Sequence, residues 1–220
     1  MDIAAKIASE LQIRNNQAEA AIKLIDEGNT IPFISRYRKE ATGALNDEQL
    51  RKLFERLNYL RNLEDRKSTV LSSIEEQGKL TAELKKQIES AETMVAVEDL
   101  YRPYKQKKRT RATIAKERGL SGLASIISLQ MTKKTLEDEA KSYIDAEKDV
   151  PDTDTAISGA LDIIAEEISD SADYRTKIRS LTFKDGNLTS VAKDPEAESV
   201  YEMYYNFSSP VSKLTGYRVL

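Results

Sequence analysis

The strongest constraint on the fold is a long run of apolar residues, spaced mostly three and four apart, between Asn46 and Gly78. This spacing is the period of one face of an α-helix. The run consists of Leu50, Leu53, Phe54, Leu57, Leu60, Leu63, Val70, Leu71 and Ile74. At its start, Asn46 can accept a backbone N–H of the first turn while Gln49 reaches back, which is a capping box. The pattern predicts one helix over about 47–77, roughly 45 Å long at a rise of 1.5 Å per residue.

Similar spacing recurs over most of the chain, while strict alternation of apolar and polar residues is rare. The fold class that this predicts is all-α, with many helices and little sheet. Further helices are expected at about 2–11, 16–28, 81–92, 134–146, 154–168 and 171–181.

Two segments near the end of the chain favour extended structure. Residues 182–192 read as a small β-hairpin with Asp185-Gly186 as its turn. The C-terminal end reads as a connector that enters a strand. Because no hairpin partner follows that strand, we expect the natural chain to continue, and this sequence to be a truncated piece of it.

Length and composition indicate a globular chain with one large or two small domains. The 220 residues are 40% hydrophobic and 32% charged. We expect a helical part over 1–100, a second helical part over 101–193, and a connector over 194–220. No run of eighteen apolar residues is present, so no membrane partner is expected. The absence of Cys fits a reducing compartment, and we expect a cytoplasmic protein.

Positive charge is concentrated between Tyr101 and Arg118, although the formal net charge of the chain is −3. Eight basic residues lie there against one acid, Glu117. Six of the basic residues are candidate ligands for nucleic-acid phosphates: Arg102, Lys105, Lys107, Lys108, Arg109 and Arg111. A second segment, 145–173, carries ten acids and one Lys. The two poles could face a partner and solvent, or they could face each other.

The same stretch predicts a helix-turn-helix-like unit over about 110–130. A threonine at position 110 or 113 can cap the first helix, Gly119 lies at the turn, and the second helix begins near Ser121. That second helix, SGLASIISLQ, has no Lys or Arg and only Gln130 as a long amide, which argues against reading of base edges. Two interpretations stay open: sequence-independent contact with phosphates, or a solvated basic loop that neutralises the acidic segment.

A second basic segment follows Gly28, in GNTIPFISRYRKEATGALND. Pro32 and Phe33 are expected inside a loop that Gly28 and Gly43 bound. One interpretation has Arg36 and Arg38 holding phosphate or a partner carboxylate. The other, which we favour at this point, pairs both guanidinium groups with nearby acids and places the rings of Phe33 and Tyr37 in the core.

The sequence offers little for catalysis. It contains no His, so catalytic triads and imidazole metal ligands are excluded, and no Gly-rich phosphate loop is present. Asp149, Asp152 and Asp154 have the spacing of calcium ligands, but Ile157 stands where the sharp-turn Gly belongs, and helix capping is the simpler interpretation. We expect no enzyme, no cofactor, no metal and no small-molecule substrate, although paired carboxylates could still meet in three dimensions.

Three blocks carry a family resemblance. They are NTIPFISRYRKEATGALNDEQLRKLFERLNYLRNLEDRK, SIEEQGKLTAEL and EDLYRPYKQKKRTRATIAKERGLSGLA, and in this order and spacing they closely resemble the N-terminal region of the bacterial Tex family, the transcription accessory proteins. The resemblance covers essentially the whole chain and is densest over 29–124. It implies a helical N-terminal region with a helix-turn-helix-like element. It also implies that an RNase-H-like domain, helix-hairpin-helix elements and a C-terminal OB-fold RNA-binding domain follow.

What the resemblance implies for function is a non-enzymatic scaffold that accompanies transcription or RNA metabolism. Its main nucleic-acid contact, with RNA the more expected ligand, lies in domains outside this sequence, and the basic patch 102–111 is auxiliary. The transcription machinery is a further expected partner. The competing prediction is a docking module, in which the helix over 47–77 or the acidic segment 145–173 binds a partner protein or another domain of the same chain.

Overall fold

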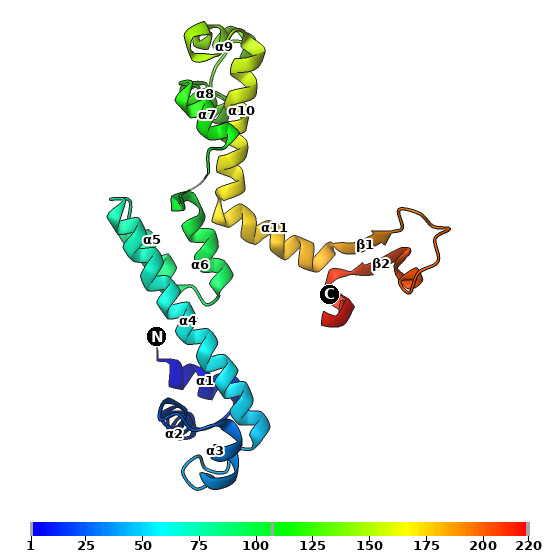
Figure 1. Ribbon diagram of the computed structural model, residues 1–220. Helices are drawn as coiled ribbons and strands as arrows, with labels where there is room; N and C mark the ends of the chain where they lie inside the picture. Colours follow the sequence, from blue (N-terminus) through cyan, green and yellow to red (C-terminus); the bar gives the residue numbers. More distant parts are fainter. Residues whose placement is uncertain (1, 107, 219–220) are drawn as a thin grey trace. The chain divides into compact units, whose positions relative to one another are not determined.

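The computed structural model describes residues 2–106 and 108–218. The chain forms two compact units, Met1–Val97 and Glu98–Leu220. Eleven α-helices and one two-stranded sheet account for most of the described residues, which confirms the predicted all-α class (Figure 1). None of the helices in the described ranges is long and apolar enough to cross a membrane.

The first unit is built on the long helix α4, Asp47–Glu76, as the apolar spacing predicts. The Asn46 side chain accepts the N–H of Gln49 at 2.8 Å, and the Gln49 side chain accepts the N–H of Asn46 at 3.0 Å. The predicted capping box is therefore present. The other helices of the first unit are α1 (Ile3–Leu11), α2 (Asn15–Asp26), α3 (Ile31–Tyr37) and α5 (Ala82–Ser90), and α6 (Met94–Tyr101) begins there.

One face of α4 forms the core of the first unit. Leu50, Leu53, Leu57, Leu60 and Leu63 are at most 1% exposed, and α1, α2, α3 and α5 all contact this helix. Phe54 belongs to the same apolar spacing but is 39% exposed, because it lies one position beyond the buried stripe. Burial of this stripe, more than helix propensity, holds a 30-residue helix in place.

The expected loop over 28–43 is wrong in part, because α3 occupies residues 31–37. Pro32 lies in the first turn of α3, where its missing N–H has no intrahelical acceptor to lose. Ile34, in the middle of α3, is fully buried. A proline that looks like a loop residue in the sequence therefore begins a short helix.

The second unit is arranged around α10, Thr153–Asp170, with α7 (Arg111–Glu117), α8 (Ser121–Leu129) and α9 (Leu136–Ala140) packed on it (Figure 1). Their shared core consists of Ala112, Ala115, Leu120, Leu123, Ala124, Ala140, Val150, Ala156, Ala160 and Ile163. Gly159 lets α10 lie close to α7 and to Leu120, because a Cβ at position 159 would lie 2.4 Å from Leu120 Cδ1 and 3.3 Å from Ala115 Cβ on α7. Small residues on α7 and α10 thus decide how near the two helices lie.

The helix expected over 134–146 is shorter than predicted. Only Leu136–Ala140 is α-helical, and two 3-10 turns follow, at Lys141–Tyr143 and Ala146–Lys148. Asp145 and Val150 exchange two backbone hydrogen bonds of 2.9 Å, which close this segment before α10. Tyr143, in the first of these 3-10 turns, packs against the core of the second unit.

The small sheet exists, but the hairpin turn at Asp185-Gly186 is wrong. Helix α11 runs from Ala172 to Asp185, and Gly186 caps it with its N–H donating to the carbonyl of Thr182 at 2.9 Å. A Cβ at Gly186 would lie 2.4 Å from that carbonyl oxygen, so the glycine is needed for close approach. Strand β1, Asn187–Val191, then pairs antiparallel with β2, Asn206–Pro210. The strand expected at the very end of the chain is not found in the described residues, where 3-10 turns occupy Val211–Lys213 and Gly216–Arg218, and positions 219–220 lie outside them. Strand β2 lies earlier, in the segment expected to be the connector.

Candidate nucleic-acid interface

The predicted phosphate ligands lie on both sides of the turn that joins α6 to α7. Arg102 is in a 3-10 helix, Arg102–Tyr104, directly after α6, where Pro103 prevents the α-helix from continuing. At the other side Thr110 caps α7, since its Oγ1 accepts the N–H of Thr113 at 3.1 Å. Lys107 lies outside the described residues.

Three of the candidate cations have intramolecular acid partners. Arg102 Nε lies 3.0 Å from Asp170 Oδ1, Arg109 lies 2.8 Å from Glu117, and Arg111 lies 3.3 Å from Asp162. Their side chains remain 46%, 68% and 86% exposed, respectively. The Arg109–Glu117 pair is exposed on both sides and contributes at most about 1 kcal/mol. The side chains of Asp170 and Asp162 are only 11% and 24% exposed, so separating Arg102 or Arg111 from its carboxylate costs more.

Lys105 and Lys108 are both exposed, and neither has an ion-pair partner among the described residues. They line a shallow surface cavity of about 400 Å³ that also includes Arg102, Thr110 and Glu166. Thr110 Oγ1 donates to Glu166 at 2.9 Å, so an acid lies at the floor of the cavity. The cavity brings together cations from both sides of the 102–110 turn.

Ion pairs between the basic stretch and the acidic segment 145–173 are present, while contact with phosphates stays a prediction. The neighbouring cations Lys116 and Arg118 pair with Glu166 and Asp149 at 3.6 and 3.5 Å. Together with Arg102 and Arg111, they bring the basic stretch and the acidic segment 145–173 onto one surface. The positive potential is thus partly neutralised from within. Among the described cations of the patch, Lys105 and Lys108 have no ion-pair partner within the described ranges, and Arg109 and Arg111 are also exposed, at 68% and 86%.

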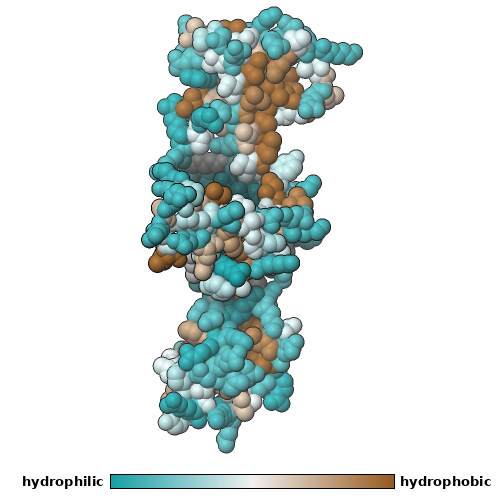
Figure 2. Space-filling model, turned by 90° about the vertical axis from the view of Figure 1, so that its right-hand side faces the viewer, coloured by the Kyte–Doolittle hydropathy of each residue, from teal (hydrophilic) through white to brown (hydrophobic). Residues whose placement is uncertain are grey.

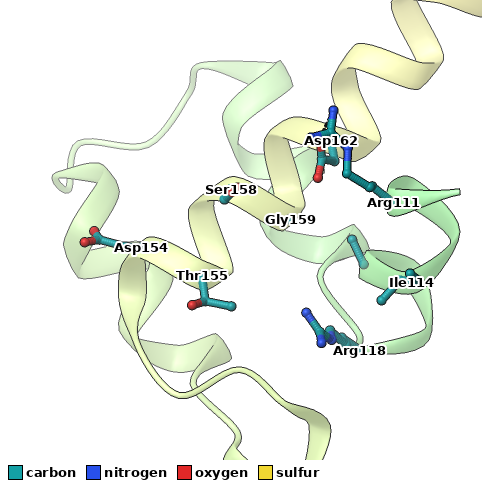
Figure 3. A pocket seen from close by; sticks show the side chains of 9 residues that line it. Arg111, Ile114, Arg118, Asp154, Thr155, Ser158, Gly159 and Asp162 are labelled. Atoms are coloured by element: carbon teal, nitrogen blue, oxygen red, sulfur yellow. Dashed lines mark ion pairs between the residues drawn. The ribbon is translucent and has the colours of Figure 1, made fainter.

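Helices α7 and α8 are joined by a turn in which Gly119 has a φ of +85°, a left-handed conformation that favours glycine. The face of α7 next to α10 borders a groove of mixed charge that Arg111, Arg118, Asp154 and Asp162 line (Figure 3). Arg111 and Asp162 lie beside each other, while Asp154 lies apart from them near the start of α10. Helix α8 presents no cation. The cations of this helix pair therefore lie on α7 and not on the second helix.

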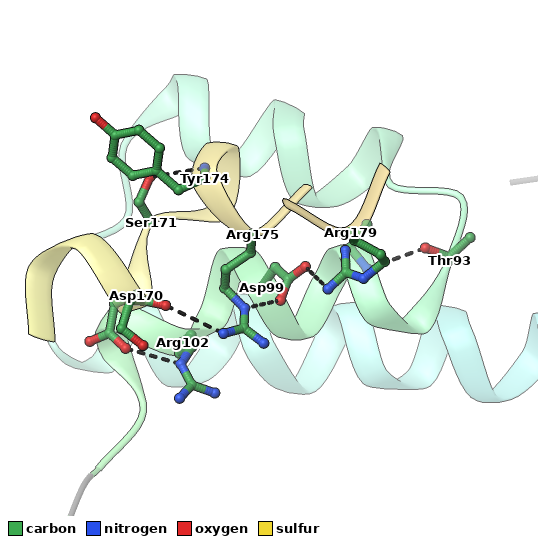
Figure 4. A network of polar contacts seen from close by, with 10 residues as sticks. Thr93, Asp99, Arg102, Asp170, Ser171, Tyr174, Arg175 and Arg179 are labelled. Atoms are coloured by element: carbon green, nitrogen blue, oxygen red, sulfur yellow. Dashed lines mark hydrogen bonds and ion pairs between the residues drawn. The ribbon is translucent and has the colours of Figure 1, made fainter. Parts of the chain in front are cut away.

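A polar network that the sequence did not indicate lies behind the patch (Figure 4). Asp99 on α6 is 5% exposed and accepts from Arg175 Nε at 2.6 Å and from Arg179 at 2.8 Å. Burial would raise the pKa of Asp99, but the hydrogen bonds from the two arginines outweigh it and hold the pKa below its ordinary value. The spacing of the two arginines, four apart on α11, is the only signal in the sequence that could have indicated a shared carboxylate.

This network positions Arg102. Asp170, the last residue of α10, is 8% exposed and pairs with Arg102, while Ser171 begins α11 by accepting the N–H of Tyr174 at 3.5 Å. Because Asp99 and Asp170 tie α6, α10 and α11 together, the start of the 102–111 patch lies on an ordered base.

The carboxylates with calcium-like spacing serve local structure, as expected. Asp152 caps α10 by accepting the N–H of Thr155 at 2.7 Å, and Asp149 pairs with Arg118. Within the described ranges no three metal-binding side chains of the His, Cys, Asp and Glu types gather into a cluster.

Comparisons with known proteins point in one direction. The family model described as the Tex-like protein N-terminal domain matches residues 1–75, and the model described as Tex central region-like matches residues 132–220. The Transcriptional accessory protein Tex of Neisseria gonorrhoeae is 43% identical over 222 residues, covering 100% of this chain and 29% of that protein. The uncharacterized protein YdcI of Bacillus subtilis is 45% identical over 218 residues, covering 98% of this chain and 30% of that protein.

A more distant relative is the human S1 RNA-binding domain-containing protein 1, which is 28% identical over 209 residues. This match covers 90% of the chain and 21% of the human protein. The chain thus spans about 30% or less of the length of the curated relatives described.

Proposed function

Since the chain belongs to the Tex family of transcription accessory proteins, we propose that it is the helical N-terminal scaffold of such a protein and makes auxiliary contacts with nucleic acid. The contacts are with phosphates and are independent of base sequence. The role is one of binding and support in the cytoplasm beside the transcription machinery, with no catalytic step.

The exposure of the patch cations carries this proposal. Lys105 and Lys108 face solvent without a carboxylate partner in the described residues, and Arg109 and Arg111 are more than half exposed. A phosphate chain that follows the 105–111 turn can contact these four side chains while the buried carboxylates Asp99 and Asp170 stay in place. Sequence independence follows because α8 lacks the long polar side chains that read base edges.

RNA is the proposed ligand class. The name of the human relative includes an S1 RNA-binding domain, and the Neisseria relative is named for transcription. The main RNA contact is proposed to lie in the length of the relatives that this chain does not span. On its own, the chain should bind RNA weakly and lose that binding as salt rises.

The test is fluorescence anisotropy of a labelled single-stranded RNA with the 220-residue chain at low salt. One variant combines Lys105→Gln, Lys108→Gln, Arg109→Gln and Arg111→Gln. The control combines Lys23→Gln, Lys79→Gln, Lys86→Gln and Lys193→Gln, which removes the same charge from four other exposed positions. We expect the patch variant to lose about tenfold or more in affinity and the control to lose much less. Equal losses in the two variants would reduce the effect to net charge and contradict the proposal.

A second candidate function, docking to protein, rests on an apolar strip along α10. Ile157, Leu161, Ile164 and Ile168 follow one another at helical spacing, and Leu161 and Ile168 are 48% and 51% exposed. Figure 2 shows apolar residues along the upper part of the molecule, at the height of α10. The proposed occupant is another domain of the full-length protein. Leu161→Lys with Ile168→Lys should leave RNA binding unchanged in the anisotropy experiment, which would separate this surface from the phosphate patch.

A further inference from the structure

The basic segment at the end of α3 differs from the one at 102–111, because no ion pair joins its cations to an acid in the part of the chain that the structure describes. Arg36, Arg38 and Lys39 are exposed, and none has an ion-pair partner among the described residues. Tyr37, between them, is 66% exposed. The interpretation favoured from the sequence, with paired arginines and Tyr37 in the core, is therefore wrong. The segment is a surface of three cations and one aromatic ring, with Glu40 as its nearest acid in sequence.

The aromatic ring and one cation of this surface have defined positions. The rings of Phe33 and Tyr37, one helical turn apart on α3, lie with centroids 5.3 Å apart at an angle of 43°. The Arg38 guanidinium lies over the Phe33 ring, 5.1 Å from its centroid, and donates to the carbonyl of Tyr37 at 3.3 Å. Phe33, which is half-buried, thus contacts both the Tyr37 ring and the Arg38 guanidinium and holds them in place.

The turn that follows α3 is held just as firmly. Thr42 is fully buried, and its Oγ1 donates to the carbonyl of Arg38 at 3.2 Å. Gln17 on α2 donates through Nε2 to the carbonyls of Thr42 and Gly43, at 3.2 and 2.9 Å. Gly43 has a φ of +59°, and a Cβ there would lie 2.8 Å from Gln17 Nε2. The cations are therefore carried on an ordered element and not on a loose loop.

Residues 36–41 line a shallow surface hollow of about 400 Å³. Three cations and one acid, Glu40, line this hollow, so its positive charge is only partly neutralised and an external anion relieves the remaining repulsion. The helix dipole accounts for Arg36 in the last turn of α3 but not for the exposed ring beside it. Phosphates together with a flat, stackable base account for both features.

We propose that Arg36, Tyr37, Arg38 and Lys39 bind single-stranded nucleic acid, with the three cations on successive phosphates and a base stacked on Tyr37. This surface belongs to the first unit, Met1–Val97, and does not depend on the 102–111 patch. The phosphates of a duplex can also pair with the three cations. Its bases, however, stay stacked on one another and do not stack on Tyr37. Single-stranded RNA and single-stranded DNA share the recognised chemistry and are separate arms of the test.

The chain contains no Trp, so one introduced indole reports on its own surroundings. Tyr37→Trp places it at the proposed stacking position. The control is Tyr201→Trp, because Tyr201 is also 66% exposed and lies outside the segment. Each variant of the 220-residue chain is titrated at low salt with unlabelled single-stranded RNA, single-stranded DNA and duplex DNA of mixed sequence. We expect saturable quenching of the indole at position 37 by both single strands, little quenching by the duplex, and none at position 201.

A second measurement separates stacking from charge. Arg36→Gln, Arg38→Gln and Lys39→Gln are combined, in the Tyr37→Trp background and in the unaltered chain, against a control of Lys23→Gln, Lys79→Gln and Lys86→Gln. The segment variant should lose the quenching and about tenfold in anisotropy-measured affinity, while the control keeps both. Quenching at position 37 that equals the quenching at position 201, or affinity that is the same in the two triple variants, would overturn the proposal. Both of these outcomes are independent of whether the 102–111 variant loses affinity. The two proposed sites are therefore tested separately.

Discussion

Single residues that break the apolar pattern hold the helices of each unit together. Lys67 lies on the buried face of α4 and is 4% exposed. The apolar spacing of the helix predicts an apolar side chain at this position. Its Nζ donates to the carbonyl of Glu89 near the end of α5 at 2.8 Å and pairs with Glu64 at 2.9 Å. The lysine thereby satisfies a carbonyl at a helix C-terminus, where cations are favoured.

Lys67→Ala should lower the free energy of unfolding by about 2–3 kcal/mol, because it removes buried methylenes and leaves the Glu89 carbonyl without its donor. Lys52→Ala is the matched control on the same helix. Its pair with Glu48 is exposed on both sides, so this substitution should change stability much less. Urea unfolding followed by circular dichroism measures both, and equal effects would contradict the structural role of Lys67.

Asp99 predicts a pH dependence. Since the pKa of Asp99 in the folded state lies below its ordinary value of 3.8, its contribution is complete at neutral pH and is lost as pH falls below about 3.8. Asp99→Asn should cost about 1–3 kcal/mol at pH 7, because two arginines lose their carboxylate. The difference from the unaltered chain should shrink towards pH 3.

The control for this pH series is Asp138→Asn. Asp138 is exposed and pairs with one lysine, Lys141. Its substitution should change stability little at pH 7. If the difference in the free energy of unfolding between Asp99→Asn and the unaltered chain stayed constant between pH 7 and pH 3, the charge of the Asp99 carboxylate would not be the source of its stabilising effect.

Elements with one strong periodic signal are predictable from the sequence, and those decided by a single contact are not. Helix α4 and its capping box were predicted, because about eight turns of apolar spacing leave few alternatives. Helix α3 was missed because Pro32 reads as a loop residue. The pairing of β1 with β2 was missed because Gly186 reads as the turn of a hairpin. In the structure Gly186 is the C-cap of α11 and precedes β1.

The predicted phosphate ligands show the same limit. Their residue types and clustering were evident in the sequence, but their partners Asp162 and Asp170 lie 51 and 68 positions away in the chain from Arg111 and Arg102. The sequence could not tell which cations the acidic segment would neutralise. For the same reason it could not show that Arg36 and Arg38 form no ion pair among the described residues, although Glu40 lines the same hollow.

The buried stripe of α4 predicts a large stability effect. Leu57 is 1% exposed, so Leu57→Ala should lower the free energy of unfolding by about 2–5 kcal/mol. Phe54→Ala, three positions earlier and at the margin of the stripe, should cost about 1–2 kcal/mol, although its side chain is larger. Thermal unfolding of the two variants compares them, and a larger effect at Phe54 would contradict the assigned core face.

Over the whole molecule, the charge is close to balanced, and binding depends on where cations remain unpaired. The formal net charge is −3, so non-specific attraction of the entire chain to nucleic acid is not expected. Binding, if present, has to come from local surfaces such as 105–111 and 36–39. That expectation gives the account a quantitative signature in its response to salt.

The most direct test is the slope of log K against log salt concentration for single-stranded RNA, measured by anisotropy on the 220-residue chain. For a single strand, each phosphate contact contributes about 0.7 to the slope. The account predicts that combining Lys105→Gln, Lys108→Gln, Arg109→Gln and Arg111→Gln lowers the slope by about 3, while the four control lysines leave it nearly unchanged. A slope that is the same in the chain and in the patch variant would contradict phosphate binding at 105–111.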